Sequence, residues 1–223
     1  MDIIISQGHT PPANPGGVTV VIDVIRAFTT AHYAFLSGAR EIRLVASADA
    51  ALALKVHDPS LLLAGEIDAL PIDGFDFGYS PVEVSQANLR GETLVQRTTN
   101  GVIATLAARH SARVFVAGLI NAAATAQWIR TQHFPRVLLV ASHPDGDEDV
   151  ACAEYMRGLL GGEGISLDDA IRRTLQASAA EKFLAGNHPH LRAEDIRMAA
   201  QEDAAAVPLE VSYASTPTIR PLR

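Results

Sequence analysis

Short runs of almost continuously apolar residues are the feature that most constrains the fold of this chain. The segments VTVVIDVI and RVLLVAS carry hydrophobic side chains at nearly every position rather than at every second one. Strands that are apolar on both faces are typical of parallel sheets covered by helices on both sides. Runs of this kind predict strands at residues 18–24, 42–46, 61–65, 93–97, 114–117 and 137–141.

Stretches rich in helix-forming residues separate these runs. Apolar residues recur there at a spacing of about 3.6, which predicts helices at residues 30–36, 48–56, 102–109, 122–130 and 149–160. Strands that alternate with helices favour an α/β fold. We therefore expect a three-layer α/β/α arrangement with a mostly parallel sheet.

The pattern changes after about residue 160. A glycine-rich segment, GGEGISLDD, contains Ser166 and Asp169 at capping-box spacing and predicts a helix through about residue 185. A loop and a further helix follow, and the tail VPLEVSYAS predicts an edge strand. Because no linker marks a boundary, we expect one domain over residues 1–223, with residues 161–223 as a mainly helical C-terminal cap.

The composition excludes several classes of protein. With 48% hydrophobic and 19% charged residues the chain is not disordered, and no apolar run reaches the roughly 18 residues of a membrane helix. A net charge of −7 and an aromatic content of 5% argue against a nucleic-acid partner. The N-terminal segment lacks signal-peptide features, so we expect a cytoplasmic protein. A homodimer is expected only from the general frequency of two-fold oligomers.

Common catalytic signatures are absent. Asp23 ends a strand, but an isoleucine stands two positions on, where aspartyl-phosphate phosphatases need a second aspartate. Arg157 follows Cys152 one residue too early for a Cys-x5-Arg phosphate cradle, so we interpret Cys152 as a small buried hydrophobic residue. His188 and His190 lie in a proline-containing segment that we interpret as a surface loop rather than a metal site. No GxxxxGK[ST], GxGxxG, HExxH or GxSxG motif occurs.

Polar residues follow the first long predicted strand, at the kind of position where α/β folds collect ligands. In DVIRAFTT these are Asp23, Arg26, Thr29 and Thr30. Asp23 could hold a divalent cation while Arg26 and the helix N-terminus receive an anion. The alternative is that Asp23 only caps the following turn.

A second strand runs into RTTNG. Two hydroxyls, an amide and a glycine, on Thr98, Thr99, Asn100 and Gly101, precede a predicted helix. This arrangement suits a phosphate, sulfonate or carboxylate. The alternative is an ordinary helix N-cap by threonine or asparagine.

The loop AGEIDALPIDGFDFGYSP is longer and more polar than most connections. Its four carboxylates, on Glu66, Asp68, Asp73 and Asp76, suggest oxygen ligands for a hard cation. For Asp68 and Asp73 we favour the alternative of solvated loop acids.

Two later segments add polar groups. GLINA places Asn121 at a strand end, and DGDEDVACA places Asp149 in an acidic cluster at the start of a helix. The helix dipole favours acidic residues there in any case.

Together these segments resemble the 2-phosphosulfolactate phosphatase family. Its members carry a D-(V)-(L/I)-R-A-(T/S)-T-T turn, a GE…LPIxGFDxGNSP loop, a TTNGT turn, an N-A-x-A strand end and a late ED…CAG helix start. DVIRAFTT, GEIDALPIDGFDFGYSP, RTTNG, INAAA and EDVACA match in the same order over residues 23–153, with a tail match at residues 195–208. The resemblance implies Mg²⁺-dependent hydrolysis of a phosphate ester on a sulfonated hydroxy acid, in the route to coenzyme M.

The resemblance also implies roles for individual residues. The implied ligands of Mg²⁺ are Asp23, Glu66 and Asp76. The implied catalytic residues are Asp23, Arg26, Asn100, Asn121 and Asp149. The implied binding residues for a small anionic phosphorylated substrate are Thr29, Thr30, Ser80, Thr98, Thr99 and Gly101. Without a covalent nucleophile, direct in-line attack by water activated near the metal is the expected mechanism.

Three residues depart from the family pattern. Phe28, Tyr79 and Val102 stand where the family has smaller or more polar residues, and the segment at residues 145–149 is shorter. These differences leave a second hypothesis open, a non-catalytic or substrate-shifted anion-binding homologue on the same fold.

Overall fold

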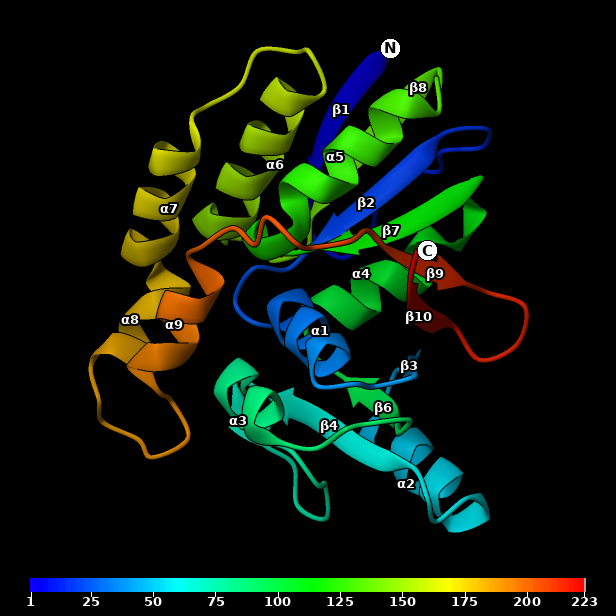
Figure 1. The fold of residues 1–223 in the computed structure, drawn as a ribbon, viewed down its shortest axis with the longest axis vertical. Coiled ribbons are helices and arrows are strands. Elements are labelled where there is room, and N and C mark those ends of the chain that lie inside the picture. The colour runs from blue at the N-terminus through cyan, green and yellow to red at the C-terminus, as the bar shows by residue number, and fades with distance from the viewer. Residues whose placement is uncertain (223) are drawn as a thin grey trace.

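A ten-stranded sheet runs through the protein, which we describe over residues 1–222 from a computed structural model (Figure 1). The strands are β1 (Asp2–Gln7), β2 (Val18–Ile22), β3 (Glu41–Leu44), β4 (Leu62–Ile67), β5 (Leu70–Pro71), β6 (Thr93–Arg97), β7 (Arg113–Ala117), β8 (Arg136–Ala141), β9 (Leu209–Ser212) and β10 (Thr218–Pro221). Their order across the sheet is β1-β8-β2-β7-β9-β10-β3-β6-β4-β5. The six predicted strands correspond to β2, β3, β4, β6, β7 and β8.

Helices cover both faces of this sheet. They are α1 (Ala27–Leu36), α2 (Ala48–His57), α3 (Pro81–Gln86), α4 (Gly101–Ala107), α5 (Ala122–Thr131), α6 (Asp147–Leu159), α7 (Leu167–Gln176), α8 (Ser178–Leu184) and α9 (Ala193–Ala199). Two 3-10 turns, η1 (Ala108–His110) and η2 (Leu119–Asn121), complete the set. None of these helices over residues 1–222 is long and apolar enough to cross a bilayer.

Alternate residues of β2 enter two different cores. Val21 packs with Ala27 and Val102, on the side of α1 and α4. Val20 and Ile22 belong to the opposite core, on the side of α5 and α6. A strand that is fully buried on both faces is almost continuously apolar, as VTVVI is, with Thr19 as its single polar residue. The prediction of an α/β fold with a mostly parallel, helix-covered sheet is confirmed.

The C-terminal tail corrects one prediction. It does not add an edge strand, because β9 pairs antiparallel with β7 and β10 pairs antiparallel with β3. The β9–β10 hairpin thus joins two parallel groups, β1-β8-β2-β7 and β3-β6-β4, in the interior of the sheet. Leu209 and Ile219 are buried there, which is the physical reason for the central place. The segment after residue 160 is therefore a helical cap with a sheet hairpin.

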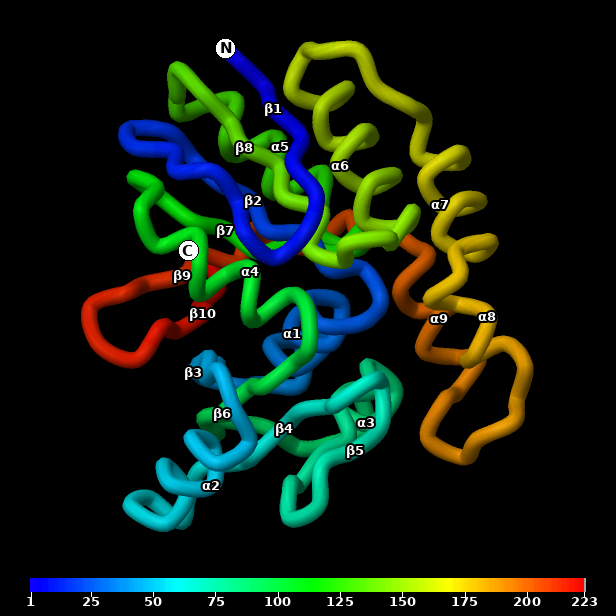
Figure 2. Tube along the Cα trace, turned by 180° about the vertical axis from the view of Figure 1, so that it is seen from behind, coloured from blue at the N-terminus to red at the C-terminus, as the bar shows by residue number. Residues whose placement is uncertain are grey.

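Two further boundaries differ from the prediction. The edge strand β1 pairs with β8 and was not predicted, because its apolar run is only three residues long, Ile3 to Ile5, and is flanked by polar residues (Figure 2). The single helix expected to residue 185 is two helices, α7 and α8, because Ala177 is extended between them. The predicted cap is present, with the Ser166 hydroxyl accepting a hydrogen bond from the Asp169 N–H.

The loops after β2 and β4 open on the same side of the molecule. Figure 1 shows both arrowheads directed toward the side on which α8 and α9 lie. The right-handed twist of a sheet rotates distant strands relative to one another. Strand ends from both parallel groups are thereby brought to one place beneath the C-terminal helices.

Candidate active site

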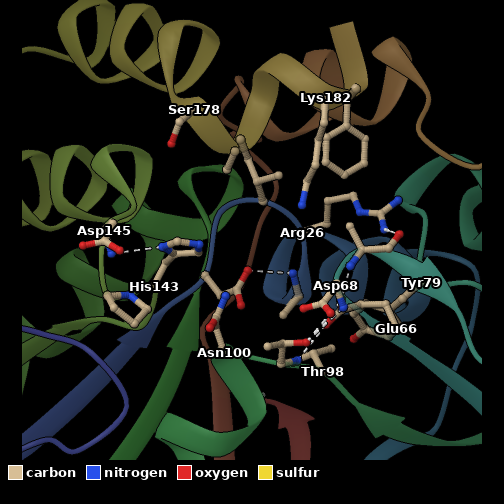
Figure 3. Close-up of a pocket in the computed structure, with 18 residues that line it drawn as sticks. Arg26, Glu66, Asp68, Tyr79, Thr98, Asn100, His143, Asp145, Ser178 and Lys182 are labelled. Carbon is tan, nitrogen blue, oxygen red and sulfur yellow. Dashed lines mark hydrogen bonds between the residues drawn. The ribbon is translucent and has the colours of Figure 1, made fainter. Parts of the chain in front are cut away.

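A pocket of about 440 Å³ lies where these strand ends meet α8. The loops after β2, β4, β6 and β8 supply most of its walls (Figure 3). It is lined by Asp23, Ile25, Arg26, Ala27, Glu66, Asp68, Ala69, Tyr79, Thr98, Thr99, Asn100, His143, Pro144, Asp145, Ser178, Ala179, Lys182 and Phe183. Residues of three predicted motifs, DVIRAFTT, GEIDALPIDGFDFGYSP and RTTNG, therefore share one cavity.

Asp23 is held at the floor of the pocket by two helix starts. Its Oδ1 accepts from the Ala27 N–H at 2.9 Å, and its Oδ2 accepts from the Gly101 N–H at 2.9 Å. A side chain at position 101 would place its Cβ 2.6 Å from that Oδ2, so the contact requires glycine. Burial, with the charge of Glu66, raises the pKa of Asp23 to about 6. The capping role expected as the alternative for Asp23 is real, and the carboxylate still lines the pocket.

Glu66 approaches the same space from the end of β4. Its Oε1 accepts from the Thr99 N–H at 2.6 Å, and its Oε2 accepts from the Ala69 N–H at 2.6 Å. Asp68 and Ala69 both have positive φ, as a tight two-residue hairpin turn between β4 and β5 requires. The turn and the loop after β6 therefore orient this carboxylate.

The RTTNG turn supplies the neutral polar wall. The Thr98 hydroxyl accepts from the Val102 N–H at 3.2 Å, so it caps α4. The Oδ1 of Asn100 lies 2.6 Å from His9 Nε2, which donates to it. With Oδ1 occupied, the amide nitrogen of Asn100 is left as a donor for a ligand.

Arg26 is buried in an ion pair rather than free to bind an anion. Its Nη1 lies 2.6 Å from Asp195 Oδ2, and its Nη2 donates to the Ala69 carbonyl at 3.1 Å. The guanidinium also stacks on the Phe183 ring, 4.6 Å from the ring centroid. Arg26 lines the pocket, but its donors are largely used to join the cap to the sheet.

Asp76 lies outside the pocket, against the expectation that it joins Asp23 and Glu66. Its Oδ2 accepts from the Lys55 ammonium at 2.5 Å and from the Leu63 N–H at 2.7 Å. The loop folds Asp76 back along β4 toward α2, away from the strand ends. Its oxygens stabilise the loop, and it is not a candidate metal ligand.

Four other predicted residues serve the framework around the pocket. Ser80 caps α3 and donates to Asp195 Oδ1 at 2.5 Å. The hydroxyls of Thr29 and Thr30 donate to backbone carbonyls within the core. Asn121 is fully buried and accepts from the Gly118 N–H at 3.0 Å. None of the four lines the pocket, so a direct substrate or catalytic contact is not supported for them.

Asp149 lies beneath the floor of the pocket rather than in it. Its Oδ1 accepts from the Val24 N–H at 2.8 Å, which fixes the loop that carries Asp23. The Ser142 hydroxyl lies 3.2 Å from Asp149 and 3.5 Å from Asp23, between the two carboxyls. Burial, together with the charges of Asp23 and Glu148, raises the pKa of Asp149 well above its usual range. Asp149 is therefore a positioning residue for the first loop.

Four polar residues of the pocket were missed from the sequence: His143, Asp145, Ser178 and Lys182. His143 and Asp145 follow β8, and the same strand-end argument that singled out Asn121 points to them. The Asp145 N–H donates to His143 Nδ1 at 3.1 Å, so the ring carries its proton on Nε2. Lys182 comes from α8, and no local pattern places that helix over the strand ends.

The donor set suits a magnesium ion held by two carboxylates. Over residues 1–222 no three carboxylate, imidazole or thiol groups converge on one point, so a protein-only cage is absent from the described chain. Mg²⁺ is commonly held by one or two carboxylates, with waters and phosphate oxygens completing the octahedron. Asp23 and Glu66 face the same cavity without a cationic partner over residues 1–222. The buried hydroxyl of Tyr79 has no hydrogen-bond partner over residues 1–222. Its burial, together with the charges of Asp23 and Glu66, raises the pKa of Tyr79 well above its usual range.

The fold and this pocket define an α/β protein with a pocket at its strand ends, lined by the carboxylates of Asp23 and Glu66 and by the polar RTTNG turn. The family model for 2-phosphosulpholactate phosphatase matches residues 4–209. A Bacillus subtilis protein named probable 2-phosphosulfolactate phosphatase is 45% identical over 199 residues, covering 88% of this chain and 87% of that protein. Proteins of the same name from Deinococcus radiodurans and Gloeobacter violaceus are 39% and 34% identical, covering 74% and 71% of this chain and 71% and 70% of their own lengths.

The chain therefore belongs to the 2-phosphosulpholactate phosphatase family, a family of phosphoric monoester hydrolases. The resemblance drawn from five ordered motifs is confirmed.

Proposed function

We propose that this protein is a Mg²⁺-dependent phosphatase that hydrolyses 2-phosphosulfolactate to sulfolactate and inorganic phosphate. The observation that carries the proposal is the pair of carboxylates, Asp23 and Glu66, facing one cavity whose other wall is the RTTNG turn. The names of the relatives supply the substrate. Magnesium, when bound by Asp23 and Glu66, would neutralise charge on the phosphoryl oxygens.

The chain's own residues prepare the site for an anion. The amide nitrogen of Asn100 and the Nε2–H of His143 are donors at the pocket wall. Burial lowers the pKa of His143, so the ring is neutral near pH 7 and donates without adding charge. Preorganised donors of this kind stabilise the charge that a phosphoryl group carries in its transition state.

The reaction needs no covalent intermediate. Water forms a bond to phosphorus, the ester P–O bond breaks, and the proton released by the water balances the charge on the departing alkoxide. Cys152 is fully buried within α6, so it does not offer a thiolate nucleophile. Direct attack on the phosphoryl group is therefore the mechanism that the site supports best.

Two of the three departures from the family pattern do not reach the pocket. Phe28 and Val102 are fully buried in the core beneath α1 and α4. Only Tyr79 lines the cavity, with φ of 64° and its hydroxyl unpaired. The departures therefore give little support to a non-catalytic homologue, and the enzyme is the hypothesis that we retain. Its place in the route to coenzyme M, its cytoplasmic location and its homodimeric state stay predictions.

Phosphate release tests the proposal. The purified protein, freed of metal with EDTA and dialysed, is incubated with 2-phosphosulfolactate with and without added Mg²⁺. We expect inorganic phosphate only when Mg²⁺ is present. Equal release in EDTA would contradict the metal requirement, and no release in either case would contradict the activity.

A further inference from the structure

The pocket carries an excess of negative charge that an anionic substrate must overcome. Asp23, Glu66, Asp68 and Asp145 line it. Of the cationic side chains in its wall, Arg26 is neutralised by Asp195 within the protein. A divalent cation at the Asp23 and Glu66 end offsets only part of this charge, so the far end needs its own cation.

Lys182 is the cation available at that far end. It projects from α8 into the cavity, on the side away from Glu66 and Thr98 (Figure 3). Over residues 1–222 no carboxylate lies within ion-pair distance of its ammonium, whereas the only other lysine, Lys55, pairs with Asp76. Because this exposed ammonium has no ion-pair partner over residues 1–222, it can bind an anionic ligand without breaking an existing ion pair.

The packing of α8 fixes where Lys182 stands. The next residue, Phe183, is buried with Ala69 and Ile196, and its ring lies under the Arg26 guanidinium. Ala69 belongs to the hairpin turn that orients Glu66. The packing of Phe183 on this turn therefore fixes α8 relative to Glu66, while the Lys182 side chain enters the cavity on the side away from that carboxylate (Figure 3).

We propose that Lys182 determines specificity by binding the non-reacting anionic group of the substrate, its carboxylate or sulfonate, while the phosphoryl group lies at the Asp23 and Glu66 end. This inference rests on the function proposed above. A lysine ammonium is a compact charge with three donors on a flexible stem, which suits a terminal anion of either geometry.

Chemical footprinting tests the contact without turnover. The chain has only two lysines, so acetylation followed by mass spectrometry reports Lys182, with Lys55 as the internal control. With Mg²⁺ present, sulfolactate at ten times its Kd should slow acetylation of Lys182 about tenfold, because only the free fraction reacts. Lys55 should react at an unchanged rate. Absence of protection at Lys182, or equal protection by inorganic phosphate alone, would overturn the proposal.

Product inhibition locates the group that is bound. In Lys182→Ala we expect the inhibition constant of sulfolactate to rise about 10- to 100-fold, the range expected for a lost hydrogen bond to a charged group. The constant for inorganic phosphate should not change, and Lys182→Arg should recover part of the loss. Lactate and 2-hydroxypropane-1-sulfonate, each carrying one of the two groups, identify the carboxylate or the sulfonate by which of them loses affinity.

A rise confined to inorganic phosphate would place Lys182 at the reacting end and overturn the proposal. The two proposals can fail separately. If the phosphatase activity is absent, the wild-type protein releases no phosphate, but the acetylation footprint still reports whether Lys182 binds the anion. Lys55→Ala serves as the matched variant, and we expect it to leave both inhibition constants unchanged.

Discussion

Asp195 Oδ2 lies 2.6 Å from Arg26 Nη1, and the two side chains are 0% and 3% exposed. They are 169 positions apart in the sequence, and their contact joins α9 to the loop that follows β2. Asp195 also accepts from the Ser80 hydroxyl at the start of α3. One buried carboxylate therefore ties the C-terminal cap to two of the loops around the pocket.

Asp195→Asn tests this link through stability. The change keeps the side-chain size but leaves Arg26 as a buried charge without a counter-ion. We expect the free energy of unfolding to fall by about 3–5 kcal/mol. Denaturant titration followed by circular dichroism measures the change.

The neighbouring residue provides the control for Asp195. Glu194 pairs with Arg197 in an exposed contact, with 60% and 70% of the side chains accessible. Glu194→Gln should therefore change stability by less than about 1 kcal/mol. If the Asp195 and Glu194 variants are equally stable, the buried ion pair does not hold the cap.

His9→Ala tests the orientation of Asn100. His9 donates to Asn100 Oδ1 at 2.6 Å and so turns the amide nitrogen toward the pocket. We expect kcat/KM to fall about 3- to 10-fold, the cost of one hydrogen bond. His9→Gln retains a donor and should recover part of the loss. An unchanged kcat/KM in His9→Ala would show that Asn100 needs no partner to face the substrate.

Cys152 should be inert in the native protein. Burial raises the pKa of its thiol well above the usual range, so the thiolate that reacts is not formed at pH 8. We expect no labelling by a thiol reagent until a denaturant unfolds the chain. We also expect Cys152→Ala to retain phosphatase activity. Rapid labelling of native protein, lost on addition of substrate, would contradict the packing role.

How much could be predicted from the sequence depended on whether a signal was local. β2 and β8 are apolar at nearly every residue, with Thr19 and Arg136 as the exceptions, because both of their faces are buried, and that pattern is visible in any short window. Asp23 and Thr98 each stand directly after a strand, β2 and β6, so the strand-end rule made both of them candidates. Because β2 and β6 belong to parallel groups that run in opposite directions, their meeting in one pocket did not follow from the fold class. The edge strand β1 is only half-buried, and its apolar run of three isoleucines is too short to give the same signal.

The remaining features depend on contacts between distant segments. The place of β9 between β7 and β10 is set by pairing, which a single sequence does not report. Arg26 carries the charge that would bind an anion, but its guanidinium is already paired with Asp195 of α9. Asp76 belongs to the same acidic loop as Glu66, yet its pairing with Lys55 turns it away from the site. The types and spacing of the residues identified candidate site residues, and contacts with distant segments determined which of these residues face the pocket.

The central claim is that Asp23 and Glu66, and not Asp76, form the Mg²⁺-dependent phosphatase site. The most direct measurement is the rate of phosphate release from 2-phosphosulfolactate as a function of Mg²⁺ concentration, for wild type, Glu66→Gln and Asp76→Asn. We predict that Asp76→Asn keeps the wild-type Mg²⁺ dependence, whereas Glu66→Gln loses at least about 100-fold in rate, as expected when a group stabilising the transition state is removed. Near-normal activity in Glu66→Gln, or its loss in a folded Asp76→Asn protein, would contradict the account.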